Sequence, residues 1–218
     1  MKRMLLGILL VLSLISCSAP ASPPNPSVQP TSGDARATPT ASAPGRESAE
    51  IPLDIMSKHP SEVDNSELPI TPVEELHFTG AVQEYDIDTY RLVVEGLVEN
   101  PLSLTYEDLL SRPQVTETVL LICPGVFWDN AEWTGTPLSL ILEEAGLSPE
   151  ASKVLIEAGG GYARILSLEE AMADGVFLAY EVNGETLPPD HGYPLRLVVR
   201  HQYGSKWVKW VERIEVTA

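Results

Sequence analysis

The stretch from residue 178 to residue 199 reads LAYEVNGETLPPDHGYPLRLVV. It joins the end of a predicted strand at 176–182 to another predicted strand at 195–199. Between them, Asn183-Gly184 is a strong hairpin signal, because both residues tolerate the positive φ angles of a type I′ turn. Two strands that flank a tight turn indicate a domain rich in β-structure.

Strands and short helices alternate irregularly on both sides of this stretch. Further strands are predicted at 90–98, 115–122, 153–157, 162–166 and 208–216. A capping box at Thr105 starts a short helix to about Leu110, and Ser167 caps another to Met172 or Ala173. A third helix is predicted from Pro137 to about Ala145, with Gly146 as its stop. The mixture predicts an α+β domain around a mixed β-sheet, mostly β with short helices.

The first residues have the pattern of an export signal. Met1-Lys2-Arg3 precedes an apolar run that is shorter than the roughly 20 residues needed to span a bilayer. The run ends at Leu14-Ile15-Ser16-Cys17, which resembles the lipobox of bacterial lipoproteins. That resemblance implies cleavage before Cys17, a lipid anchor on Cys17, and an exported protein held on the extracytoplasmic side of the membrane. An ordinary signal peptide is the alternative.

The chain is predicted to have three parts. Residues 1–17 are the lipoprotein signal peptide, and residues 18–50 are a disordered tether of Pro, Ser, Ala and Thr. Residues 51–218 are long enough for one domain with a substantial core. We expect this last part to carry the function.

The charge balance is strongly acidic. With 14 Lys and Arg against 31 Asp and Glu, the formal net charge is −17, which argues against general nucleic-acid binding. The cations are nevertheless concentrated near the end of the chain, where five fall within the last 23 positions: Arg196, Arg200, Lys206, Lys209 and Arg213. This cluster is either a local anion site or an ordinary solvated face.

The sequence has only two cysteines, Cys17 and Cys123. If Cys17 is lipidated, Cys123 has no partner within the chain, so it is buried and inert, paired between chains, or functional. It follows the apolar residues 119–122 and precedes Pro124-Gly125. The end of a strand that opens into a loop is a common place for a functional site.

Several motifs in order resemble the molybdopterin-binding domain of the sulfite oxidase family, which includes bacterial catalytic subunits acting on methionine sulfoxide. The likeness extends from about Leu68 to the C-terminus. The motifs are an isolated cysteine after an apolar strand, Trp133-x-Gly135-x-x-Leu138, the Asn183-Gly184 turn, His191-Gly-x-Pro-x-Arg196 and Val208-Lys209-Trp210.

The resemblance implies a molybdenum–molybdopterin cofactor and a site to hold it. Cys123 matches the metal ligand and central catalytic residue, and thiolates suit such metals. His191 and Arg196 match positions that hold the pterin phosphate, and Lys209 with Trp207 and Val208 matches a further cofactor-binding segment. Trp207 and Val208 are equally consistent with plain core residues. His77 and Thr79 lie where the family usually has Phe-x-Arg-Asn-His, and are expected to contact the cofactor.

The implied function is a molybdenum-dependent oxidoreductase that transfers an oxygen atom to or from a small molecule, either sulfite-like or sulfoxide-like. A haem protein or a membrane redox partner would exchange the electrons. Residues 123–130 carry no cation, whereas sulfite oxidases typically have arginines there. This departure favours a less charged substrate. It also leaves open a non-catalytic cofactor- or anion-binding lipoprotein on the same fold, and a Cys–His hydrolase remains a third hypothesis.

Overall fold

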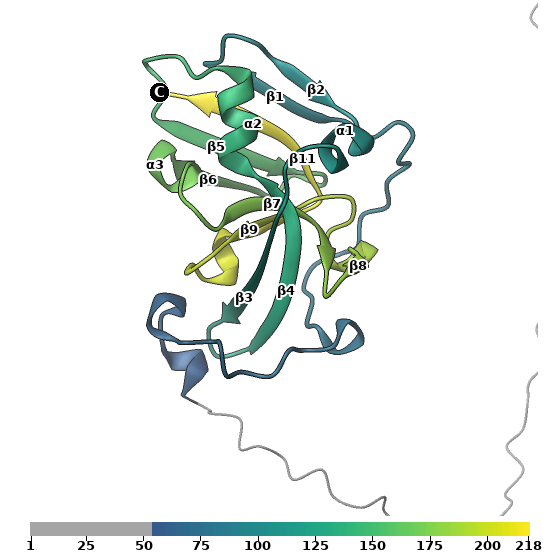
Figure 1. The fold of residues 1–218 in the computed structure, drawn as a ribbon, viewed down its shortest axis with the longest axis vertical. Coiled ribbons are helices and arrows are strands. Elements are labelled where there is room, and N and C mark those ends of the chain that lie inside the picture. Colours follow the sequence, from purple (N-terminus) through teal and green to yellow (C-terminus); the bar gives the residue numbers. More distant parts are fainter. Residues whose placement is uncertain (1–53) are drawn as a thin grey trace, which may run out of the picture. The chain divides into compact units, whose positions relative to one another are not determined.

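The computed structural model describes residues 54–218, so the predicted signal peptide and tether lie outside the described residues. The first of its two sheets has the strand order β2-β1-β11-β5-β6 (Figure 1). Its strands are β1 (Leu92–Gly96), β2 (Leu102–Leu104), β5 (Lys153–Ala158), β6 (Ala163–Ser167) and β11 (Val211–Thr217). Strands β1 and β11 are parallel and the other pairs are antiparallel. The predicted mixed sheet is therefore confirmed.

The second sheet has the order β10-β9-β7-β4-β3 and is antiparallel. Its strands are β3 (Val115–Cys123), β4 (Phe127–Pro137), β7 (Val176–Val182), β9 (Arg196–Val199) and β10 (Val208–Lys209), with β8 (Glu185–Thr186) paired to β7. The long β3–β4 hairpin extends away from the first sheet (Figure 1). At its tip Cys123 lies opposite Phe127.

The turn in the opening stretch forms as the sequence predicts. Asn183 has a φ of 51° and Gly184 a φ of 76°, so both adopt the left-handed conformation of a type I′ turn. The side chain of Asn183 has a second role, because its Oδ1 accepts a hydrogen bond from Glu132 N at 2.9 Å. The turn thereby joins β7 to β4 as well as to β8.

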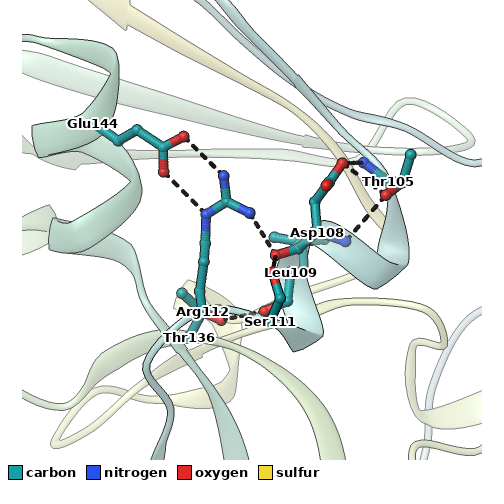
Figure 2. A network of polar contacts seen from close by, with 7 residues as sticks. All are labelled: Thr105, Asp108, Leu109, Ser111, Arg112, Thr136 and Glu144. Carbon is teal, nitrogen blue, oxygen red and sulfur yellow. Dashed lines mark hydrogen bonds and ion pairs between the residues drawn. The ribbon is translucent and has the colours of Figure 1, made fainter.

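Three short helices cover the sheets: α1 (Tyr106–Leu110), α2 (Leu138–Ala145) and α3 (Leu168–Ala171). The capping boxes predicted at Thr105 and Ser167 both form. Figure 2 shows Thr105 bonded to Asp108 and, beyond α1, Arg112 reaching both oxygens of Glu144 on α2 at 3.0 and 2.8 Å. Five single-turn 3-10 helices complete the described elements: η1 (Ile55–Ser57), η2 (Pro60–Glu62), η3 (Val73–Glu75), η4 (Pro189–His191) and η5 (Gly204–Lys206).

One continuous cluster of buried side chains joins both sheets to α2. Ile214 of β11, Phe177 of β7 and Ile141 of α2 are each 0% exposed. Burying each such side chain contributes about 1.5–3 kcal/mol, so this shared core holds the two sheets in one domain. No helix within residues 54–218 is long and apolar enough to cross a bilayer.

Two features of the strand pattern differ from the sequence prediction. Strand β4 was not predicted, because Asp129, Asn130 and Gly135 are residues typical of turns. In the structure the two polar side chains are buried and hydrogen-bonded within a long strand. The predicted strand at 208–216 is divided into β10 and β11, because Trp210 has a φ of 58° and turns the chain between the sheets.

Residues 54–79, called the N-terminal segment below, run along the β3–β4 hairpin. Asn130 of β4 holds this segment: its Nδ2 donates to Asn65 O and Leu68 O at 3.3 and 3.1 Å. Asn183 Nδ2 donates to Thr71 O at 2.9 Å. These bonds fix the path of the segment and bring its last residues, including His77, to the functional site.

Candidate active site

A cavity of about 390 Å³ lies where the tip of the hairpin meets the N-terminal segment and the β5–β6 turn. Strand β9, η5 and the β10 region complete its walls. Six of the predicted site residues line it: His77, Thr79, Cys123, Arg196, Trp207 and Lys209. Residues separated by up to 132 positions in the sequence therefore meet at one site.

Cys123 is the last residue of β3, and its side chain is half-buried. Burial raises the pKa of the thiol, and Asp129 raises it further, while Arg196 opposes both effects. The space beside the sulfur depends on Gly204 of η5, where an added Cβ would lie only 2.9 Å from Sγ. The thiol is thus accessible, and a bound cation would favour its thiolate form.

Arg196 supplies a buried positive charge. Its guanidinium lies 4.8 Å from the ring of Trp133 and 5.2 Å from that of Trp207. Nη1 donates to His191 O at 3.0 Å, whereas Nε is buried without a hydrogen-bond partner. Burial lowers the pKa of Arg196 to about 10, so it remains a cation at neutral pH. A buried donor without a partner costs about 1–3 kcal/mol, so the protein holds this guanidinium without satisfying all of its donors.

Lys209 provides the second cation of the cavity. Its Nζ donates to the carbonyl oxygens of Thr79 and Asp190 at 2.6 and 2.9 Å, and lies 4.4 Å from the ring of Trp210. Burial lowers its pKa to about 8, with Arg196 contributing and Asp190 opposing. Among residues 54–218, neither Arg196 nor Lys209 forms an ion pair with a carboxylate. Their charge is therefore available to an anionic ligand.

Two of the predicted site residues do not line the cavity. His191 is buried at the end of η4, where burial lowers its pKa to about 4 and keeps the ring neutral at pH 7. Its contact with the site is indirect, through the carbonyl that accepts from Arg196. Val208 is fully buried and pairs with Leu197, which makes it a core residue of the second sheet. Trp207 lines the cavity and also donates from Nε1 to Val199 O at 3.0 Å.

Three contacts around the site were not predicted from the sequence. Gly204 makes room for the thiol, Trp133 stacks on Arg196, and Asp129 binds His77. The sequence indicates neither the contact of Trp133 with Arg196 nor the role of the Asp129 carboxylate. No local pattern marks these roles, because each depends on contacts between distant segments.

The donor set fits a metal cofactor that carries an anionic group. One thiol lies in the same cavity as two cations that have no carboxylate partner among the described residues, and Gly159 and Gly160 contribute to its lining. Within the described residues, no cluster of three or more His, Cys, Asp or Glu side chains could hold a metal ion. A single thiolate suits a metal whose remaining ligands come from the cofactor.

The protein-family model named oxidoreductase molybdopterin-binding domain matches residues 79–218 of this chain. The chain belongs to this family. It is 37% identical over 142 residues to the oxidoreductase YuiH of Bacillus subtilis, covering 64% of this chain and 71% of YuiH. It is 34% identical over 169 residues to a sulfite oxidase of Arabidopsis thaliana, covering 61% of this chain and 43% of that enzyme.

Other members of the molybdopterin-binding family extend the comparison. A nitrate reductase of Aspergillus niger is 34% identical over 163 residues, covering 62% of this chain and 19% of that enzyme. The structure of the sulfane dehydrogenase SoxCD from Paracoccus pantotrophus superposes with a TM-score of 0.64 at 36% identity, covering 67% of this chain and 43% of that chain. The chain thus spans most of YuiH but less than half of these larger enzymes.

Family membership confirms the main sequence predictions. The protein has the sulfite oxidase-like fold, its cofactor is molybdenum–molybdopterin, and it is a molybdenum-dependent oxidoreductase. The match begins at residue 79, so Asp129 lies within it whereas His77 lies outside it. The cavity described above provides a thiol and cations suited to this cofactor.

Proposed function

We propose that this domain catalyses the transfer of an oxygen atom between a small molecule and a molybdenum centre held at Cys123. The observation that carries the proposal is the shared cavity, where the Cys123 thiol lies with Arg196 and Lys209. Both cations lack a carboxylate partner among the described residues, so an anionic cofactor would find its charge matched. When bound, the cofactor supplies a two-electron redox change coupled to oxygen transfer.

The chain's own residues have separate tasks in this proposal. Cys123 Sγ is the metal ligand, while Arg196 and Lys209 bind the pterin phosphate. The ring of Trp207 lies against the guanidinium of Arg196, 5.2 Å from its centroid, and helps to position it. Thr79 and His191 act through their carbonyl oxygens, which fix Lys209 and Arg196 respectively. Val208 anchors β10 against β9 and so places Lys209 at the cavity.

The charges in the cavity support a substrate with little negative charge. The hairpin tip beside Cys123 has no cation, and the two cations of the cavity are assigned to the cofactor. Holding a small dianion in a partly buried pocket without compensating charge is costly. Phe127 and Leu121 add apolar surface next to the thiol. We therefore place a sulfoxide-like compound ahead of a sulfite-like one.

We also propose that the domain is exported and attached to the extracytoplasmic side of the membrane through Cys17. The apolar run and the Leu14-Ile15-Ser16-Cys17 sequence support this. A haem protein or membrane redox partner would then exchange the electrons. Mass spectrometry of the mature N-terminus tests the anchor, because it should show Cys17 as the first residue with a lipid mass attached. An unmodified Cys17 or an uncleaved signal would contradict the proposal.

The function is tested by producing the chain in a host that makes molybdopterin. Near-stoichiometric molybdenum and pterin are expected, with a metal that changes oxidation state when a sulfoxide is added. Cys123→Ser should keep the pterin but lose this change, because the thiolate ligand is gone. Purified wild type with neither molybdenum nor pterin contradicts the proposal. A loaded metal that never changes oxidation state with sulfoxide, sulfite or nitrogen-oxide substrates supports the non-catalytic alternative.

A further inference from the structure

Asp129 of β4 binds a single residue through both of its carboxylate oxygens. Oδ2 accepts from the backbone N–H of His77 at 3.0 Å, and Oδ1 lies 2.8 Å from His77 Nδ1. The Asp129 side chain is only 1% exposed, whereas the His77 side chain is 56% exposed. A buried carboxylate thus holds the main chain and the ring of a residue that faces the solvent.

This contact fixes the tautomer of His77. A carboxylate offers only acceptors to these two bonds, so Nδ1 carries the hydrogen and Nε2 is the nitrogen left free. The ring also stacks on Phe127, with centroids 4.7 Å apart and planes inclined by 8°. The Asp129 contact and the Phe127 contact together determine the orientation of the imidazole.

The orientation brings His77 to the wall that carries the thiol. Phe127 lies directly opposite Cys123 in the hairpin register, and His77, Phe127 and Cys123 all line the cavity. Within residues 54–218, His77 Nε2 makes no hydrogen bond to another side chain or to the main chain. His77 lines the cavity and its side chain is 56% exposed, so its free ring nitrogen can exchange protons between cavity and solvent.

We propose that His77 Nε2 transfers protons between solvent and the substrate oxygen, and that Asp129 is the residue that positions it. This inference rests on the proposed oxygen-atom transfer. Conversion of an oxo compound to its reduced form and water takes two protons and two electrons. The proposed haem protein or membrane redox partner supplies the electrons one at a time. For each proton, the Nε2–H bond breaks, an O–H bond forms, and solvent reprotonates Nε2. In the opposite direction Nε2 accepts the protons.

The other groups at the cavity are less suited to this task. Arg196 and Lys209 are assigned to the cofactor phosphate, and His191 does not line the cavity. Asp129 holds the ring at Nδ1 and leaves Nε2 to exchange the proton, which is how a carboxylate behind a catalytic histidine orients the ring in general. Since His77 lies before the matched residues 79–218, the pair combines a residue outside the family match with one inside it.

The tautomer is measured by nitrogen-15 NMR of the imidazole groups in the full chain. The His77 signal is assigned by its loss in His77→Gln. In its neutral form, His77 should have a protonated Nδ1 and a free Nε2. In Asp129→Asn the side-chain amide has one acceptor, its oxygen, and one donor, its NH₂ group. If the oxygen keeps the hydrogen bond from the backbone N–H of His77, the NH₂ group faces Nδ1. Nδ1 must then accept, so the ring should change to the Nε2–H tautomer. A wild-type ring already in the Nε2–H form overturns the inference.

The second test uses the holoenzyme with dimethyl sulfoxide as substrate and a reduced viologen dye as electron donor. His77→Ala should lower kcat about 10²–10⁴-fold with a smaller change in KM, because one proton-transfer group is lost. Added imidazole should restore part of the rate through the open cavity. His201→Asn is the matched control and should keep wild-type kcat, since His201 is exposed, lies outside the cavity lining and has a φ of 66° that Asn accepts.

Two outcomes of the second test contradict the inference. Unchanged kcat in His77→Ala shows that no proton passes through this residue. Loss of molybdenum or pterin in His77→Ala shows a cofactor contact in place of a proton-transfer group. The failure of the proposed function looks different, because wild type would then contain no cofactor. Loaded wild type that turns over no oxo probe contradicts the proposed function and with it the proton transfer. The tautomer measurement then still tests whether Asp129 positions the His77 ring.

Discussion

At the scale of single residues, Arg196 shows how packing prepares a charge for a ligand. Two indole rings and the carbonyl of His191 hold the guanidinium, while Nε remains without a partner. Lysine keeps the charge but has neither the planar group that stacks on the rings nor the fork that binds phosphate through two bonds. The site therefore requires the planar guanidinium of arginine as well as its positive charge.

We predict that Arg196→Lys lowers pterin content about tenfold or more, which corresponds to the loss of about 1.4 kcal/mol of binding free energy. Pterin is measured by fluorescence after oxidation of the purified protein. Arg213→Lys is the matched control, because Arg213 pairs with Glu95, Glu157 and Glu215 on the first sheet, outside the cavity. Equal pterin in Arg196→Lys and wild type would show that Arg196 does not bind the cofactor.

His191 makes a prediction about pH because it is buried as a neutral ring. Burial lowers its pKa to about 4, from the ordinary value of 6.5. The unfolded chain therefore binds more protons between these values, so the free energy of unfolding falls as pH drops from 6.5 towards 4. From pH 7 to pH 5, wild type without cofactor should lose about 2 kcal/mol more than His191→Asn. Urea unfolding at both pH values measures this, and parallel losses in the two proteins would contradict it.

At the scale of elements, the sequence predicts best what is determined locally. The helices begin at Thr105 and Ser167 because each capping box is complete within four residues. The Asn183-Gly184 turn likewise depends on two backbone conformations. Strand β4 was missed because its Asp129 and Asn130 are compatible with a strand only when the distant N-terminal segment binds them. The cavity includes residues of both kinds. The resemblance predicted its two cations and its thiol, whereas Asp129 was not predicted.

Asn130 of β4 is therefore expected to stabilise the N-terminal segment. Asn130→Ala leaves the carbonyl groups of Asn65 and Leu68 without their donor, and should cost about 1–3 kcal/mol. Residues 54–78 should then become the first site of cleavage by a protease at low concentration. Asn100→Ala serves as control, because Asn100 is exposed and its side chain makes no hydrogen bond in the described part of the chain. Cleavage at the same rate in all three proteins would contradict the prediction.

At the scale of the whole molecule, the cavity is the place where separate parts of the domain meet without filling the space between them. Its walls come from the N-terminal segment, the β3–β4 hairpin, the β5–β6 turn and the β9–β10 region, which belong to both sheets. A ligand that fills the cavity would contact all of these parts at once. Because it binds the folded chain and not the unfolded one, its binding free energy adds to the stability of the whole domain.

The loaded protein should accordingly unfold at a higher temperature than the cofactor-free protein. Cofactor at 100 times its dissociation constant adds about 2.7 kcal/mol, and each kcal/mol raises Tm by about 2–4 °C for a domain of this size. A rise of about 5–11 °C is therefore expected by calorimetry, with slower amide exchange at Thr79, Gly160 and Lys209. Cys123→Ser loaded with pterin should show a smaller rise, because the metal–sulfur bond is absent. Equal Tm with and without cofactor, or protection confined to the hairpin, would mean that the cofactor does not bridge the walls of the cavity.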